Sequence, residues 1–217
     1  MTRGRLFVVT APSGAGKTSL VRALMHDDPT LVHSVSYTTR SPRPGEEHGK
    51  DYFFVARDEF ARMVAAGAFL EHAEVFDNAY GTARAQVEAS LAAGRNVVLE
   101  IDWQGAQQVR AAMPECVPIF ILPPSMPELE RRLRERAERE RKALMGSAGA
   151  ATEFARRLRD AQDDMRHWSA AEYVVVNDSF EQALEDLKSV FAGRGKALGR
   201  DRSDLRPLIG ALLARSD

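Results

Sequence analysis

The chain has 217 residues, enough for one large domain or for a core with an inserted subdomain, and it can bury a sizeable core. Its 30 basic and 31 acidic residues leave a net charge of −1, which excludes a global field that would attract nucleic acid or acidic membranes. The single cysteine, Cys116, excludes an intramolecular disulfide framework, and we expect it to be a small buried residue. No run is long and apolar enough for a transmembrane helix or a signal peptide, so we expect a soluble, cytoplasmic protein.

An apolar run at residues 6–9 is expected to form a strand, and the first helix runs to about His26. Between them lies a glycine-rich loop, in the context that a phosphate-binding P-loop needs, because backbone N–H groups and the helix N-terminus attract phosphate oxygens. Lys17 would reach the outer phosphates, and the Thr18 hydroxyl would hold Mg²⁺. The strict pattern has glycine where this chain has Ala11, so an ordinary glycine-rich turn is the alternative. The loop residues are Ala11, Pro12, Ser13, Gly14, Ala15, Gly16, Lys17 and Thr18.

The middle of the chain is expected to form a small α+β insert. Residues 32–39 and 52–55 are strand-like, and the prolines and glycine of residues 41–45 force a loop between them. Asp58 is expected to cap a helix that runs through Ala66. Strand-like pieces follow at residues 69–76, and a helix is expected from about residue 82 to residue 93.

The rest of the chain alternates strands with helices, which predicts a parallel sheet covered by helices on both faces. Small residues at 145–151 interrupt two long helices. The tail from residue 193 ends in an apolar patch that predicts a short helix, and the tail is either a dimer contact or a frayed end. The expected strands are 97–102, 117–122 and 173–177, and the expected helices are 105–112, 126–142, 153–168, 180–191 and 205–213.

Two groups of side chains suit phosphate chemistry. Glu100 and Asp102 are two residues apart, so in a strand both would face the same side and could hold a metal; a salt-bridged acid is the alternative. Arg40 and Arg43 lie three residues apart on a proline-stiffened loop rich in hydroxyls, with Tyr52 nearby. Because arginine binds phosphate through two parallel hydrogen bonds, this loop predicts a second phosphate site, with a solvated basic loop as the alternative.

Blocks spread over nearly the whole chain resemble the guanylate kinase family, whose P-loop usually carries alanine at the position of Ala11. Several of these blocks are highly specific to that family. They are Ala-Pro-Ser-Gly-Ala-Gly-Lys-Thr from Ala11, Ser-Tyr-Thr-Thr-Arg-Ser-Pro-Arg-Pro-Gly-Glu from Ser36, Gly-Lys-Asp-Tyr-Phe-Phe from Gly49, Phe-Leu-Glu-His-Ala-Glu-Val-Phe from Phe69, Tyr-Gly-Thr from Tyr80, Ile-Asp-Trp-Gln-Gly-Ala-Gln-Gln from Ile101 and Val-Asn-Asp from Val176.

The resemblance implies an α/β fold in which a P-loop NTPase-type parallel sheet is sandwiched by helices, with an inserted α+β GMP-binding subdomain and a helical lid. It implies an enzyme, an ATP:GMP phosphotransferase that transfers the γ-phosphoryl group of ATP to GMP with Mg²⁺ and recycles guanine nucleotides. The implied parts are a P-loop core at residues 1–35, 95–131 and 159–192, a GMP-binding subdomain at 36–94, a lid at 132–158 and a C-terminal tail at 193–217.

The resemblance also implies roles for single residues. Glu71 and Thr82 would read guanine, because a carboxylate accepts from the ring N–H and the 2-amino group, and adenine offers neither donor there. Asn177 would contact adenine, and it could also cap the helix that starts near Phe180. The GMP set is Ser36, Arg40, Arg43, Tyr52, Glu71, Tyr80, Thr82, Glu100 and Asp102; the ATP set is residues 11–18 with Arg132, Arg136 and Asn177. The catalytic set is Lys17, Arg40, Arg43, Arg136 and Arg157, and the metal set is Thr18 and Asp102, the latter through water.

Two departures from the family pattern bear on these roles. Glu100 stands where the family usually has aspartate, which keeps the charge but adds a methylene. The lid carries extra residues at roughly 139–150, and Glu135 and Ala137 replace glycines. Most arginines there alternate with glutamates, which is typical of a solvated helix with i,i+4 pairs.

The partners expected are the small-molecule substrates ATP and GMP, with no nucleic acid and no membrane, and homo-oligomerisation stays open. Two other functions compete with the kinase. One is a non-catalytic scaffold with the same fold, but such modules typically lose the P-loop lysine that Lys17 keeps here. The other is a P-loop kinase for a different phosphorylated metabolite, which the Glu71 block and the Tyr80-Gly81-Thr82 block argue against.

Overall fold

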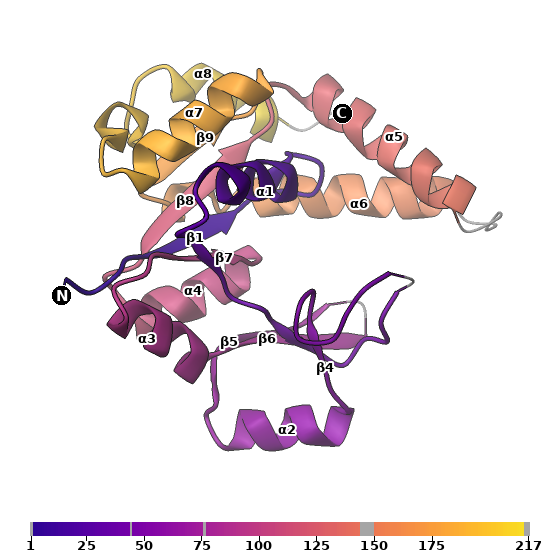
Figure 1. Ribbon diagram of the computed structural model, residues 1–217. Helices are drawn as coiled ribbons and strands as arrows, with labels where there is room; N and C mark the ends of the chain where they lie inside the picture. The colour runs from indigo at the N-terminus through magenta and orange to yellow at the C-terminus, as the bar shows by residue number, and fades with distance from the viewer. Residues whose placement is uncertain (1, 44, 76, 144–149, 215–217) are drawn as a thin grey trace. The chain divides into compact units, whose positions relative to one another are not determined.

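The computed structural model describes residues 2–43, 45–75, 77–143 and 150–214. Contacts divide the chain into two compact units (Figure 1). Unit 1 comprises Met1–Val8 and Asp28–Val117, and unit 2 comprises Val9–Asp27 and Pro118–Asp217. The chain therefore enters unit 2 through the P-loop, returns to unit 1 for the following ninety or so residues, and ends in unit 2.

The larger sheet has five strands in the order β2-β7-β1-β8-β9. Strand β1 (Leu6–Thr10) is buried along its whole length, as a strand covered on both faces should be. Strand β2 (Val32–His33) pairs parallel with β7 (Val97–Glu100), and β8 (Val117–Leu122) pairs parallel with β9 (Tyr173–Val176). These pairings confirm the α/β class with a parallel sheet and helices between the strands.

Unit 1 also contains a smaller sheet with the strand order β4-β3-β6-β5. The apolar core of unit 1 brings Leu70 together with Leu99 and Val109. Residues of the insert therefore share one core with β7 and the helix after it. The further elements of unit 1 are β3 (Tyr37–Thr38), β4 (Phe53–Phe54), α2 (Arg57–Ala65), β5 (Phe69–Val75), β6 (Asn78–Ala83), α3 (Arg84–Ala92) and α4 (Trp103–Ala112).

In unit 2 the long helices α5 (Met126–Ala143) and α6 (Ala150–Met165) pack against each other (Figure 1). Helix α8 (Leu205–Leu213) forms at the predicted residues and buries Leu205 and Leu212 in the core of this unit. That part of the tail is therefore packed rather than frayed. The further elements are α1 (Lys17–Asp27), η1 (Trp168–Ala170), α7 (Phe180–Phe191) and η2 (Gly195–Leu198).

Several predicted boundaries were wrong. Helix α2 starts at Arg57, and its N-cap position is Ala56, which makes no side-chain cap, so Asp58 lies inside the first turn and does not cap the helix. Residues 78–83 form strand β6, and the helix expected from residue 82 begins at Arg84. The strand expected at 32–39 is two short strands, and α6 begins at Ala150, within the segment expected to be irregular. The rest of that segment, residues 145–149, lies outside the described residues.

The environment of Cys116 and the apolar length of the helices were both predicted from the sequence. Cys116 is buried, as predicted for a packing residue. Within the described ranges, no helix is both long enough and apolar enough to cross a bilayer.

Candidate functional site

The P-loop forms in unit 2 between β1 and α1, as predicted. Gly14 and Gly16 have φ of 88° and 94°, a region that favours glycine, so the loop could not take this path with larger residues at these positions. The N–H of Ala15 donates to the carbonyl of Pro12 at 3.2 Å and closes a turn. Helix α1 then begins at Lys17, so the N–H groups of its first turn and its positive dipole end lie beside the loop, as an anion site requires.

Asn177 lies next to this loop in unit 2. It follows β9, is 4% exposed, and its Nδ2 donates to the carbonyl of Ala15 at 2.7 Å. A Cβ at Gly16 would come within 2.3 Å of the same nitrogen, so the amide and the loop are tightly packed. The helix cap expected as an alternative role belongs to Ser179, whose hydroxyl accepts the N–H of Gln182 at 3.3 Å.

The arginines expected to contact ATP lie on α5 and α6 of unit 2. Arg132 donates from Nε to Glu128 at 2.7 Å and from its terminal nitrogen to the carbonyl of Asn177 at 3.1 Å. Hydrogen bonds from Arg131 and Arg132 lower the pKa of Glu128 to about 2. Further pairs three and four residues apart confirm the solvated, charge-paired character predicted for α5. Arg136 is exposed on α5, and Arg157 is half-buried on α6.

In unit 1, Arg40 is held by a carboxylate that the sequence prediction did not include. Both terminal nitrogens of Arg40 donate to Glu46, at 3.0 and 2.9 Å, and the backbone N–H of Arg43 donates to the same carboxylate at 2.7 Å. This pairing lowers the pKa of Glu46 and raises the pKa of Arg40. The only sequence signal for Glu46 was its place at the end of the block that begins at Ser36. Its separation of six residues from Arg40 fits no helical pairing.

Aromatic rings surround the same guanidinium. Arg40 lies over the ring of Tyr52 at 5.4 Å and over that of Phe54 at 5.8 Å. Tyr52 meets Tyr80 edge-on with the ring centroids 6.0 Å apart. Ser36, between β2 and β3, accepts the N–H of Phe53 through its carbonyl at 2.9 Å. The structure therefore brings together Arg40, Tyr52 and Tyr80, while the side chain of Arg43 is exposed.

Glu71 and Thr82 face each other across the β5–β6 pair. The Thr82 hydroxyl donates to Oε1 of Glu71 at 2.5 Å, and the two residues are 0% and 5% exposed, respectively. Burial raises the pKa of Glu71 to about 6; the bond from Thr82 opposes this shift, and the negative charge of Asp102 adds to it. A carboxylate placed this way is a strong, directional acceptor that is costly to leave unpaired.

Glu100 and Asp102 do not lie on one face of a strand, because β7 ends at Glu100. Asp102 is instead the N-cap of α4 and accepts the N–H of Gly105 at 2.7 Å. Oε1 of Glu100 lies 3.7 Å from Nε2 of His33, an ion pair whenever the imidazole is protonated. In the described part of the chain, no group of three His, Cys, Asp or Glu side chains is arranged to hold a metal ion.

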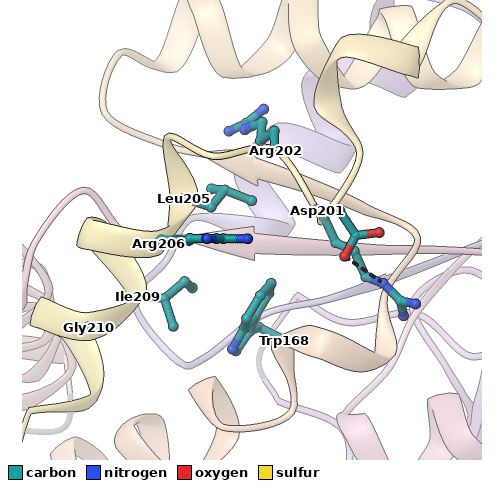
Figure 2. A pocket seen from close by; sticks show the side chains of 8 residues that line it. Trp168, Asp201, Arg202, Leu205, Arg206, Ile209 and Gly210 are labelled. Carbon is teal, nitrogen blue, oxygen red and sulfur yellow. Dashed lines mark ion pairs between the residues drawn. The ribbon is translucent and has the colours of Figure 1, made fainter.

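A cavity of about 380 Å³ near the C-terminus of unit 2 contains none of the predicted site residues (Figure 2). Two of its arginines are engaged in the fold: Arg200 donates to the carbonyl of Ser169 at 2.7 Å, and Arg202 pairs with Asp204 at 3.1 Å. Arg200 also pairs with Asp201, with Nε 3.7 Å from Oδ1, and a dashed line at Asp201 in Figure 2 marks this ion pair. We assign these arginines to the packing of the tail.

Comparisons with known proteins agree with the resemblance seen in the sequence. Residues 3–194 match the family model described as guanylate kinase. A guanylate kinase of Alkalilimnicola ehrlichii is 50% identical over 95% of this chain and 99% of its own. One from Salmonella typhimurium is 48% identical over 99% of this chain and 100% of its own. The crystal structure of guanylate kinase from Anaplasma phagocytophilum superposes with a TM-score of 0.70 at 32% identity, covering 99% of this chain and 98% of that one.

Proposed function

The chain belongs to the guanylate kinase family, and we infer from this that it is a nucleoside monophosphate kinase that transfers the γ-phosphoryl group of ATP to GMP, giving ADP and GDP. The observation that carries the choice of acceptor is the buried Glu71 carboxylate bonded to Thr82. A carboxylate in this position can accept hydrogen bonds from the ring N–H and the 2-amino group of guanine. A base without those donors would leave the buried carboxylate unpaired, which can cost roughly 10⁴-fold in discrimination.

The ATP site of this proposal lies in unit 2. The backbone N–H groups of residues 11–16 would surround the β- and γ-phosphates, and Lys17 would neutralise the charge that develops on them. Arg132, Arg136 and Arg157 are proposed to contact the phosphates from the lid at residues 132–158. Asn177 is proposed to contact adenine, and its amide nitrogen, which donates to the carbonyl of Ala15, also holds the loop.

The GMP site lies in unit 1, within the proposed GMP-binding subdomain at residues 36–94 and the turn after β7. Arg40 and Arg43 would hold the phosphate, together with the hydroxyls of Ser36, Tyr52 and Tyr80. Glu71 and Thr82 would read the base. Glu100 and Asp102 are proposed to contact the remaining part of GMP, the longer Glu100 keeping the charge of the usual aspartate.

The transfer itself needs little covalent chemistry from the protein. The GMP phosphate is already anionic and nucleophilic, so no strong general base is required. Catalysis then rests on positioning the two phosphates and neutralising charge as the γ-phosphoryl group passes between them, by Lys17 and by the catalytic arginines Arg40, Arg43, Arg136 and Arg157. Closure of the lid would exclude water, which otherwise competes with GMP for the phosphoryl group.

Mg²⁺ bound to ATP is the proposed cofactor, and its chemistry is to draw charge from the phosphate oxygens. The residues present fit it: Thr18 lies in the first turn of α1 and is an exposed residue, and a hydroxyl oxygen is a suitable hard ligand. Asp102, whose Oδ1 caps α4, is the second proposed ligand, through water. With so few protein ligands, the nucleotide and water would supply the remaining ones. We place the reaction in the cytoplasm, where it would recycle guanine nucleotides.

A coupled assay of ADP release tests this function. ATP and Mg²⁺ are supplied with GMP, AMP, CMP or UMP in turn, and we expect turnover with GMP to exceed that with the other three by several orders of magnitude. Equal turnover with another monophosphate would point to a kinase for a different metabolite. Binding of GMP without any turnover would point to a scaffold.

A further inference from the structure

Gly105 occupies the third position of α4 and is buried. It is not among the residues with positive φ, so its backbone conformation does not require glycine. A glycine at such a position lowers helix stability relative to alanine, and it needs another reason to be there. The reason is the space beside it: a Cβ on Gly105 would lie 2.7 Å from Oε2 of Glu71 and 3.3 Å from Oδ1 of Asp102.

We propose that Gly105 is a positioning residue for guanine recognition, because the absence of its side chain leaves the space that the Glu71 carboxylate occupies. One oxygen of Glu71 accepts the Thr82 hydroxyl, and the other lies against the first turn of α4 at Gly105. The Thr82 hydroxyl and the open space beside Gly105 together determine where the carboxylate can lie. This inference rests on the proposed role of Glu71 in reading the base.

A methyl group at Gly105 would displace the carboxylate rather than the helix. Carbon and oxygen atoms that are not bonded to each other normally approach to about 3.3–3.6 Å, so a distance of 2.7 Å must be relieved. Helix α4 is fixed to β5 next to the site: Gln108 donates to the carbonyl of His72 at 2.9 Å and accepts its N–H at 3.1 Å. Asp102 also holds the N–H of Gly105 itself. The Glu71 side chain is the group left to move.

The test is Gly105→Ala, assayed for KM and kcat with each substrate. We expect KM for GMP to rise by roughly tenfold or more, the effect of losing one well-placed hydrogen-bond acceptor. KM for ATP and kcat at saturating GMP should change little. The preference for GMP over IMP, which lacks the 2-amino group, should shrink. Gly210→Ala is the matched control, because Gly210 is also a helical glycine and a Cβ there would meet nothing within 4 Å.

A double variant separates positioning from a general structural effect. With Glu71→Ala, the group that the methyl would collide with is gone, so adding Gly105→Ala should cause no further rise in KM for GMP. If Gly105→Ala alone fails to fold, the double variant should recover the melting temperature of Glu71→Ala. An unchanged KM for GMP in Gly105→Ala, or additive effects in the double variant, would overturn the inference. Absence of GMP turnover in the unmodified chain would instead overturn the proposed function.

Discussion

Glu71 is a buried carboxylate whose environment favours the protonated form, yet the proposed function uses the charged form as an acceptor. Burial raises its pKa to about 6, despite the opposing bond from Thr82. In the free chain the group therefore takes up a proton as the pH falls through 6, above the pH at which an ordinary glutamate does so. GMP binding must then compete with that proton.

This competition predicts a pH dependence for GMP binding. Below about pH 6, the apparent affinity for GMP should fall by up to tenfold per pH unit, while KM for ATP stays nearly constant. The phosphate of GMP titrates in the same range, so the control is Glu71→Gln, which keeps the phosphate titration and removes that of the carboxylate. Titration calorimetry at pH 5 to 8 measures both proteins. Identical pH slopes for the two would contradict the role of Glu71.

We expect Glu46 to position the two arginines that are proposed to bind the GMP phosphate, rather than to compete with that phosphate. Glu46→Ala removes the carboxylate to which both terminal nitrogens of Arg40 and the Arg43 N–H donate, so we expect KM for GMP to rise several-fold, to roughly tenfold. Guanosine, which has no phosphate, should bind with unchanged affinity. Glu47→Ala is the matched control, because Glu47 is exposed and pairs with Lys50. A fall in KM for GMP would mean that the carboxylate competes with the phosphate instead.

At the scale of single elements, long apolar patterns were the reliable guide. Helix α7 and strand β8 have the predicted bounds, because each carries a pattern that its own residues determine. Strand β6 was missed, since its residues Asn-Ala-Tyr-Gly-Thr-Ala show no apolar alternation and it forms by antiparallel pairing with β5 and β3. The cap by Asp102 was also missed, because a carboxylate two residues after Glu100 reads equally well as the end of a strand.

Asn177, directly after β9, bonds to the P-loop, and the sequence could not predict this hydrogen bond because its two residues are 162 positions apart. Asn177→Ala would leave the buried carbonyl of Ala15 without its donor and loosen the loop. We expect KM for ATP to rise by roughly tenfold, with KM for GMP unchanged. Asp178→Ala, at the exposed neighbouring position, is the control. A rise in both KM values of Asn177→Ala would indicate a general loss of structure.

At the scale of the whole molecule, the two predicted substrate sets fall into the two contact units. The residues expected to bind GMP lie in unit 1, and the P-loop, Arg132 and Asn177 lie in unit 2. Composition and spacing predicted the α/β class and a loop that binds a nucleoside triphosphate. They did not predict which molecule accepts the phosphoryl group. The prediction that GMP accepts the phosphoryl group came from the resemblance carried by the Arg40–Arg43 and Glu71 blocks, because strand β6, which brings Thr82 opposite Glu71, was not predicted.

This distribution predicts that the two substrate sites can be disabled separately. Lys17→Ala removes the charge proposed to neutralise the transferring phosphoryl group, and Lys17 belongs to unit 2, whereas the residues proposed to bind GMP belong to unit 1. Turnover of GMP should fall by three or more orders of magnitude, the loss expected when a group that neutralises transition-state charge is removed.

The assignment of ATP and GMP to separate sites is tested most directly by titration of GMP into Lys17→Ala, measured by calorimetry beside the unmodified chain. A GMP affinity within about twofold of the unmodified value, in a protein that has lost turnover, is the predicted result. Loss of GMP binding together with turnover would contradict the assignment of GMP recognition to Arg40, Arg43 and Glu71 in unit 1.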